Sequence, residues 1–229
     1  KGYEVHVFEA LHEIGGVLKY GIPEFRLPNK IVDVEIENLQ KIGVHVHTDC
    51  IVGKTISIDE LKANGFKGFF VGSGAGLPNF MGIPGENALN IMSSNEYLTR
   101  INLMDAANEH ADTPINIGKN VLVVGGGNTA MDSCRTAKRL GSNVTLVYRR
   151  SEAEMPARLE EVKHAKEEGI TFLPLHNPIE YIADESGAVK QVVLQEMQLG
   201  EPDASGRRRP EPIPNGIKKL DIDFVVVAI

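Results

Sequence analysis

Apolar residues follow two different periods in this chain of 229 residues. Between Val32 and Ile42 they recur every three or four positions, which is typical of a helix with one buried face, and Gly43 ends the pattern. At residues 44–47 valine and histidine alternate, as in a strand with one exposed face. Segments of the two kinds succeed one another along the chain, which predicts an α/β fold with parallel sheets.

The first half of the chain carries two helix-start signals. Ser57 followed by Glu60 has the form of a capping box, in which each side chain bonds the other residue's backbone. The same spacing recurs at Ser93 and Glu96, ahead of a second short helix. The strands that we expect in this half are 3–8, 44–47 and 66–71, and the last of them should be buried.

A polar stretch at 104–117, which contains Pro114, separates the two halves. We place a domain boundary within it, so that the expected domains are 1–108 and 109–229. The stretch 200–216 has four prolines and three consecutive arginines, and it is expected to be a loop. The other elements expected in the second domain are strands at 120–124, 144–148 and 170–175, helices at 128–140 and 156–168, and a hairpin of 179–183 with 189–198.

The strongest motif joins a strand to a helix through three glycines. Residues 121–124 are apolar, and residues 125–130 fit the dinucleotide-binding pattern G-x-G-x-x-A. Gly125 permits the tight turn, Gly127 lets the backbone approach a pyrophosphate, and Ala130 lets the helix pack close to the strand. The N–H groups at the start of the helix would then face the phosphates. The alternative is a glycine turn that binds no ligand.

The residues that end the next strand discriminate between cofactors. NAD-binding proteins carry a carboxylate there for the ribose 2′-hydroxyl, whereas this chain has Arg149 and Arg150. A guanidinium suits a 2′-phosphate, because its planar fork forms charge-assisted pairs with phosphate oxygens. The sequence therefore favours NADP over NAD, unless these arginines are merely solvated at a strand end.

The opening of the chain repeats this strand end with the opposite charge. Glu9 follows an apolar strand just as Arg149 does. A carboxylate in this place suits a nucleotide without a 2′-phosphate, which predicts a first nucleotide site whose glycine loop would lie upstream of Lys1. Taken alone, a carboxylate such as Glu9 is more often a surface residue than a ligand. Because neither end of the sequence reads as a natural terminus, we expect an internal piece of a longer protein.

Composition excludes several classes of function. The formal net charge is -7, and a chain this acidic is a poor candidate for binding nucleic acid. No apolar run reaches the roughly 18 residues that a membrane helix needs, and no signal peptide opens the sequence. Two cysteines, Cys50 and Cys134, fit a reducing compartment rather than a disulfide scaffold. We therefore expect a cytoplasmic protein without membrane or nucleic-acid partners.

Five longer motifs point to one family. They are Val7-Phe8-Glu9, residues 15–28 (GGVLKYGIPEFRLP), residues 125–132 (GGGNTAMD), Tyr148-Arg149-Arg150 and residues 154–158 (EMPAR). These motifs resemble the glutamate synthase small-subunit family of FAD- and NAD(P)-binding oxidoreductases, and the resemblance covers nearly the whole chain. Residues 66–85 and 199–210 look most like one branch of it, the large subunit of NADH-dependent reduced ferredoxin:NADP oxidoreductase, also called sulfide dehydrogenase alpha subunit.

This resemblance implies two Rossmann-like domains with parallel sheets and a β-meander. Residues 1–108 would be an incomplete FAD-binding domain and residues 109–229 an NADP(H)-binding domain. The full-length protein would bind FAD, and iron–sulfur clusters are expected only in an N-terminal region that this sequence lacks. The residues implied for FAD are Glu9 at the ribose, Gly16, Val17 and Arg26 at the flavin or its pyrophosphate, and Val52 at the adenine. Those implied for NADP(H) are Gly125, Gly126, Gly127, Asn128 and Thr129 at the pyrophosphate, with Arg149, Arg150 and Arg158 at the 2′-phosphate.

The resemblance also implies the chemistry. Hydride would pass between NADP(H) and FAD, so the cofactors carry the reaction and no catalytic residue is named. Electrons would be relayed to or from iron–sulfur clusters and a partner, either a glutamate synthase large subunit or a flavin subunit linked to ferredoxin and NADH. The isolated fragment is expected to show little or no catalysis. The alternative is an NADP(H)-binding or assembly module without turnover.

Three other features allow two interpretations each. His45, His47 and Cys50 could ligate a metal, but no fourth ligand is near in sequence, and we expect no metal. Arg207-Arg208-Arg209 could dock an acidic redox partner, although a solvated loop is the simpler interpretation. The two cysteines are far apart and neither belongs to a C-x-x-C motif, so no redox disulfide is expected, and Cys134 should pack in the core.

Overall fold

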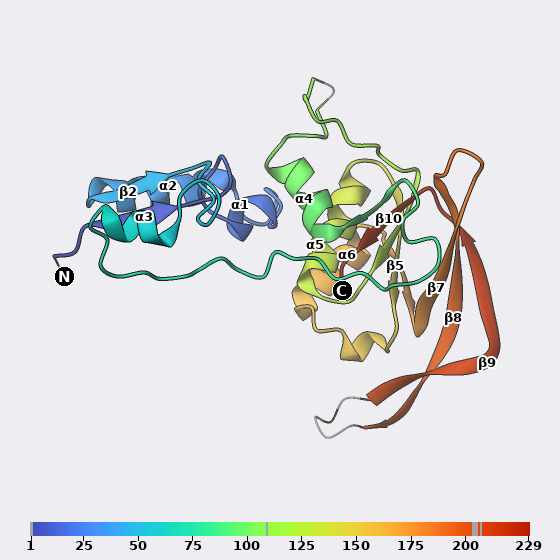
Figure 1. Ribbon diagram of the computed structural model, residues 1–229. Helices are drawn as coiled ribbons and strands as arrows, with labels where there is room; N and C mark the ends of the chain where they lie inside the picture. Colours follow the sequence, from blue (N-terminus) through green and yellow to red (C-terminus); the bar gives the residue numbers. More distant parts are fainter. Residues whose placement is uncertain (1, 109, 203–205, 207) are drawn as a thin grey trace. The chain divides into compact units, whose positions relative to one another are not determined.

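The computed structural model describes residues 2–108, 110–202, 206 and 208–229 (Figure 1). The chain forms two compact units, Lys1–Gly76 and Leu77–Ile229. The boundary therefore differs from the expected one at 108/109. The reason is that β3 (Ile91–Ser93) pairs with the last strand of the second unit, β10 (Phe224–Val227).

The first unit is a two-stranded parallel sheet with helices. Strand β1 (Val5–Phe8) pairs in register with β2 (Val44–His47), which is the strand that the alternating pattern predicted. The helices of this unit are α1 (Val17–Tyr20), α2 (Asn29–Lys41) and α3 (Ile58–Ala63). The capping box predicted at Ser57 is present, with the Glu60 N–H donating to the Ser57 hydroxyl at 3.1 Å.

The prediction of a buried strand at 66–71 is wrong. These residues are extended without strand pairing, and Phe70 is 96 % exposed. An apolar run becomes a strand only where another strand can bond its backbone, and β1 and β2 pair only with each other among the described residues.

The second unit is built on a five-stranded parallel sheet in the order β3-β10-β4-β5-β6. Its other strands are β4 (Asn120–Val124), β5 (Asn143–Tyr148) and β6 (Thr171–Pro174). The last strand, β10, thus lies inside the sheet between β3 and β4, and it is buried at every position. The α/β fold with a parallel sheet is confirmed.

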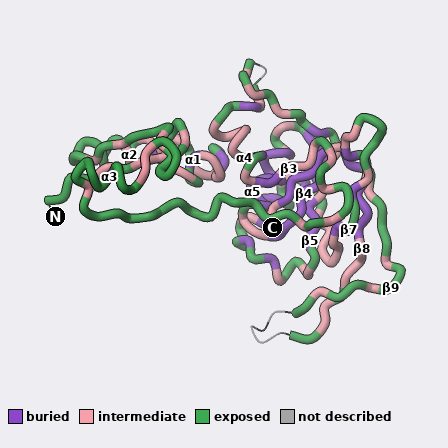
Figure 2. Tube along the Cα trace, in the orientation of Figure 1, coloured by how far each residue is buried: buried purple, intermediate pink, exposed green. Residues whose placement is uncertain are grey.

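Each face of this sheet has its own hydrophobic layer. On one face, Val121 and Val123 pack with the helices α4 (Ser94–Asn102), α5 (Asn128–Arg139) and α6 (Leu159–Glu167). On the other face, Leu122 and Val124 pack against an antiparallel three-stranded meander. Figure 2 shows that the buried residues of the second unit concentrate in the strands of the parallel sheet and in α5. The strands of the meander are β7 (His176–Ala183), β8 (Val189–Pro202) and β9 (Arg208–Asp221).

The meander corrects a second expectation. Residues 200–216 do not form a simple loop, because β8 continues to Pro202 and β9 begins at Arg208. Strand β9 lies at the edge of its sheet, and its prolines at 210, 212 and 214 are spaced two apart. Pro210 and Pro212 lie in the regular part of the ladder, so their nitrogens, which carry no hydrogen, share one side of the strand, and an edge strand tolerates this. The expected arginine cluster includes Arg207, which lies outside the described residues.

Candidate dinucleotide-binding site

The glycine turn between β4 and α5 is closely packed on its inner side. Gly125 has φ +145°, and a Cβ there would lie 2.1 Å from the backbone oxygen of Ala228. A Cβ on Gly126 would lie 2.7 Å from the ring of Tyr148. At Gly127, in contrast, a Cβ would meet nothing within 4 Å. The first two glycines are therefore required by the protein's own packing, and the third borders open space.

The N-terminus of α5 is suited to an anion. Gly127 is its N-cap, no side chain caps it, and its first turn contains no acidic residue. The first N–H groups of a helix have no partner inside it, and the helix dipole places partial positive charge there. Helix α3 differs, since Ser57 caps it and Asp59 and Glu60 occupy its first turn. A phosphate group fits the start of α5.

Helix α5 is held firmly in the second unit. Ala130, Met131 and Cys134 are fully buried, so the helix lies close to the sheet as the motif requires. Arg135, whose side chain is 8 % exposed, bonds Glu161 at 2.6 Å and Glu168 at 2.9 Å. These ion pairs tie α5 to α6 and to the residue that ends it.

The pKa of Glu168 reflects this network. Burial alone would raise it, but hydrogen bonds from Arg135 and Arg139 outweigh burial and hold the pKa below its usual value. The carboxylate therefore stays charged in the folded protein and keeps α5 and α6 together.

The end of β5 lies beside the glycine turn. The hydroxyl of Tyr148, whose ring covers Gly126, donates to the backbone oxygen of Glu154 at 3.1 Å. Arg149 follows directly and is exposed. Arg150 is half-buried, and its Nε donates to the backbone oxygen of Arg208 on β9 at 2.9 Å. Of the two arginines, Arg149 is the one presented to solvent.

The segment before α6 also contacts the glycine turn. The N–H of Ala157 donates to the oxygen of Gly126 at 3.1 Å, and the N–H of Arg158 donates to Oδ1 of Asn128 at 2.9 Å. The structure therefore brings residues 125–129 and Arg158 together, next to Tyr148 and the strand end that carries Arg149. This is the carboxyl edge of a parallel sheet, where nucleotides bind in open α/β folds.

Sequence reasoning did not identify the residues that support this turn. Tyr148 fixes Gly126 from one side and Ala157 bonds it from the other. Both lie in motifs that carry the resemblance, Tyr148-Arg149-Arg150 and residues 154–158, but those motifs do not reveal their contacts with the turn.

The residues implied for FAD lie in the first unit. Glu9 follows β1, and its Oε1 accepts the N–H of Leu11 at 3.0 Å. Gly16 has φ +52° and begins α1, and Val17 next to it is exposed. Arg26 is half-buried and Val52 is exposed. A role for these five residues in FAD binding stays a prediction.

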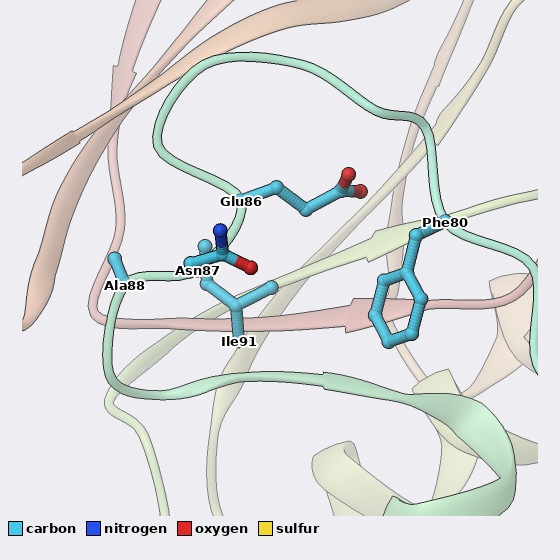
Figure 3. Close-up of a pocket in the computed structure, with 5 residues that line it drawn as sticks. All are labelled: Phe80, Glu86, Asn87, Ala88 and Ile91. Atoms are coloured by element: carbon cyan, nitrogen blue, oxygen red, sulfur yellow. The ribbon is translucent and has the colours of Figure 1, made fainter.

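A separate hollow in the second unit contains none of the predicted site residues. It is lined by Phe80, Glu86, Asn87, Ala88 and Ile91 (Figure 3). The Glu86 carboxylate accepts the N–H groups of Met81 at 2.8 Å and Gly82 at 2.6 Å, so it stabilises its own loop.

The cysteines behave as the sequence predicted. Both are free, and Cys134 is buried with its Sγ donating to the oxygen of Met131 at 3.2 Å. Burial raises the pKa of the Cys134 thiol, so it stays protonated and unreactive. In the part of the chain that the structure describes, no helix is long and apolar enough to cross a membrane.

Comparison with solved structures shows the same fold. FprA from Mycobacterium tuberculosis superposes with a TM-score of 0.81 at 17% sequence identity, over 98% of this chain and 63% of that one. Thioredoxin reductase from T. acidophilum gives a TM-score of 0.57 at 13% identity, over 100% of this chain and 69% of that one.

Curated relatives match along the whole sequence. The beta subunit of NADP(+)-dependent formate dehydrogenase from Moorella thermoacetica is 41% identical over 100% of this chain and 32% of its own length. The small chain of glutamate synthase [NADPH] from Azospirillum brasilense is 36% identical over 100% of this chain and 48% of its own length. The chain thus spans between a third and a half of these relatives, and the resemblance to glutamate synthase small chains is confirmed. Since residues 2–229 match its family model, the chain belongs to the pyridine nucleotide-disulphide oxidoreductase family.

Proposed function

We propose that this chain is the NADP(H)-binding part, with a portion of the FAD-binding part, of an electron-transferring flavoprotein subunit. The observation that carries the proposal is the uncapped, acid-free start of α5 beside the exposed Arg149. The relatives support it, since formate dehydrogenase subunit beta and the glutamate synthase small chain are named for NADP(+) or NADPH.

The residues of the second unit bind and orient the dinucleotide. The backbone of Gly125, Gly126 and Gly127, with Asn128 and Thr129, holds the pyrophosphate. Arg149 pairs with the 2′-phosphate, and Arg150 and Arg158 add positive charge to the same edge. Asn128 also anchors the Arg158 backbone, so the phosphate and ribose contacts move as one rigid group.

The first unit contributes to FAD binding in the full-length protein. We assign Glu9 to the ribose, Gly16, Val17 and Arg26 to the flavin or its pyrophosphate, and Val52 to the adenine. When both cofactors are bound, they supply hydride transfer between nicotinamide and flavin. The protein positions them and needs no side chain as nucleophile or general acid.

Further electron transfer takes place outside this chain. The relatives are named as beta subunits and a small chain, and by analogy a second oxidoreductase subunit receives or supplies electrons, through iron–sulfur clusters outside this sequence. That subunit is of the glutamate synthase large-subunit type or a flavin subunit linked to ferredoxin and NADH. A cytoplasmic location is part of this proposal.

Calorimetric titration with NADPH and NADH tests the nucleotide site. We expect NADPH to bind at least about tenfold more tightly, which is about 1.4 kcal/mol and within reach of one charge-assisted phosphate contact. Arg149→Ala should abolish this preference. The matched control is Arg100→Ala, because Arg100 bonds Glu96 within α4 and takes no part in the site. Equal affinity for both nucleotides in the unaltered chain would contradict the proposal.

The second candidate function is an NADP(H)-binding or assembly module without turnover. The full-length protein separates the two, because only an oxidoreductase subunit reduces its flavin when NADPH is added. The visible absorbance of the oxidised flavin should fall on mixing, because the flavin accepts the hydride. A full-length protein that binds NADPH but contains no flavin would favour the module.

A further inference from the structure

Three histidines share one face of the sheet in the first unit. His6 of β1 lies directly opposite His45 of β2, and their rings are stacked with centroids 4.6 Å apart. His47 lies two residues further along β2, on the same face. Parallel pairing therefore brings together imidazoles that are far apart in the sequence.

Glu4 adds a carboxylate to this cluster. Its Oε1 lies 3.1 Å from Nε2 of His6 and 3.7 Å from Nε2 of His45. The ligand atoms of all three residues lie within 4.8 Å of one another. Zinc bonds of about 2.0–2.2 Å would place tetrahedral ligands roughly 3.3 Å apart, and two of the observed distances bracket that value. The remaining distance, between His45 and His6, can adjust on binding, because the His45 side chain is 53 % exposed and free to move.

His47 and Phe66 hold the His6 ring in place. Nδ1 of His6 lies 2.9 Å from Nε2 of His47, and the edge of the Phe66 ring contacts His6 with centroids 5.0 Å apart. The Nε2 atom of His6 is thereby directed toward Glu4. Metal-binding histidines commonly bond a second group through their other nitrogen in this way.

We propose that Glu4, His6 and His45 form a binding site for a divalent transition-metal ion, with Zn²⁺ as the best fit, and that His47 is a positioning residue for His6. Two imidazoles and a carboxylate are a ligand set suited to zinc, and they leave a fourth position for water or an external ligand. For Nε2 of His6 to bind the metal, the neutral imidazole must carry its single ring proton on Nδ1, where it donates to Nε2 of His47.

This site differs from the group of possible metal ligands that the sequence suggested. There, His45, His47 and Cys50 gave no complete ligand set, and no metal was expected. Within the described residues the structure groups His45 with His6 and Glu4 instead, and Cys50 is not part of the group. The site is independent of the proposed nucleotide binding, because all of its residues lie in the first unit.

The metal would add a side-chain link between β1 and β2, which already pair through their backbones. Binding to the folded state alone stabilises it, so zinc should raise the unfolding temperature of the first unit. The site thus acts as a structural clip between two strands.

The test is a calorimetric titration of the complete 229-residue chain, free of any affinity tag, with Zn²⁺. We expect one ion per chain. Affinity should fall at least about tenfold in His45→Gln, which alters an exposed side chain and should leave folding intact, and also in Glu4→Gln. The control is His164→Gln, an exposed histidine on α6 in the second unit, which should bind zinc unchanged.

The proposed positioning role of His47 is tested by a measurement that a purely structural role would not change. His47→Gln keeps an oxygen that accepts the Nδ1 hydrogen of His6, whereas His47→Leu does not. We expect zinc affinity to fall about tenfold in His47→Leu and to be largely kept in His47→Gln. Nitrogen-15 NMR of the zinc-bound chain should show the His6 proton on Nδ1. No zinc binding by the unaltered chain, or equal binding by His45→Gln, overturns the proposal.

Discussion

The two units contain the same kinds of element but bury them to very different extents. In the first unit, Val32 and Leu61 are the buried large hydrophobic residues among those described, while Val5 and Val7 of β1 are exposed. In the second unit, β10 and four residues of β4 are buried, with hydrophobic layers on both faces of the sheet. Parallel sheets are normally covered on both faces, so only the second unit meets that requirement by itself.

Because of this difference in burial, the structure supports the two proposed nucleotide sites to different degrees. The glycine turn is fixed by three neighbours, which are Ala228 just after β10, Tyr148 and Ala157. The residues implied for FAD lie on loops of a unit with a small core, and Val17 and Val52 among them are exposed. The NADP(H) site can therefore be argued from geometry, whereas the FAD site rests on resemblance.

The largest expected effect comes from truncating one leucine in each unit, a buried one in the second and a half-exposed one in the first. Leu122→Ala creates a cavity in a fully buried layer and should lower the free energy of unfolding by about 2–5 kcal/mol. Leu39→Ala, the same change on the half-exposed face of α2, should cost about 1 kcal/mol or less. Urea unfolding, with hydrogen exchange of peptides from each unit, measures both. Similar losses would show that the first unit has a core comparable to the second.

Charged clusters provide the next comparison. Glu168→Gln should destabilise the protein by about 1.5–3 kcal/mol at pH 7, because it weakens charged hydrogen bonds to Arg135 and Arg139. In the first unit, Glu13 and Asp33 both pair with Lys19, so Glu13→Gln leaves one partner and should cost under about 1 kcal/mol.

The pH dependence of this effect has a definite sign. The folded pKa of Glu168 lies below its ordinary value of 4.5, so its contribution is complete above that value and disappears as pH falls through the folded pKa. The difference in stability between the unaltered chain and Glu168→Gln should therefore shrink below pH 4.5. A difference that stays constant down to pH 2 (roughly the limit of such shifts) would mean that the charge of Glu168 is unimportant.

The local elements of the second unit could be predicted because each has a signal within a few residues. Strand β4 occupies the predicted residues 120–124, and α5 begins at the predicted Asn128. The hairpin turn near Asp184 is also present, with the Ser186 N–H donating to the Asp184 carboxylate at 2.8 Å. Glycine turns, caps and apolar runs determine such features locally.

Features that depend on distant partners could not be predicted. Residues 66–71 have strand composition but pair with nothing in the described chain, and 208–221 have loop composition but pair with β8. The grouping of Glu4, His6 and His45 arises from the register of β1 against β2, which no local pattern contains. The boundary at Gly76 likewise follows from the pairing of β3 with β10.

The smallest change tests the site itself. Among the described residues, a Cβ added at Gly127 meets no atom within 4 Å, so Gly127→Ala should change stability by less than about 1 kcal/mol. If the pyrophosphate approaches the backbone there, the same methyl group blocks it and NADPH affinity should fall at least about tenfold. Gly68→Ala is the matched control in the first unit, since a Cβ there also meets nothing within 4 Å and its φ is not positive. Unchanged NADPH binding by Gly127→Ala would place the nucleotide elsewhere, whereas a loss confined to that variant would show that the open space beside Gly127 is where the phosphates bind.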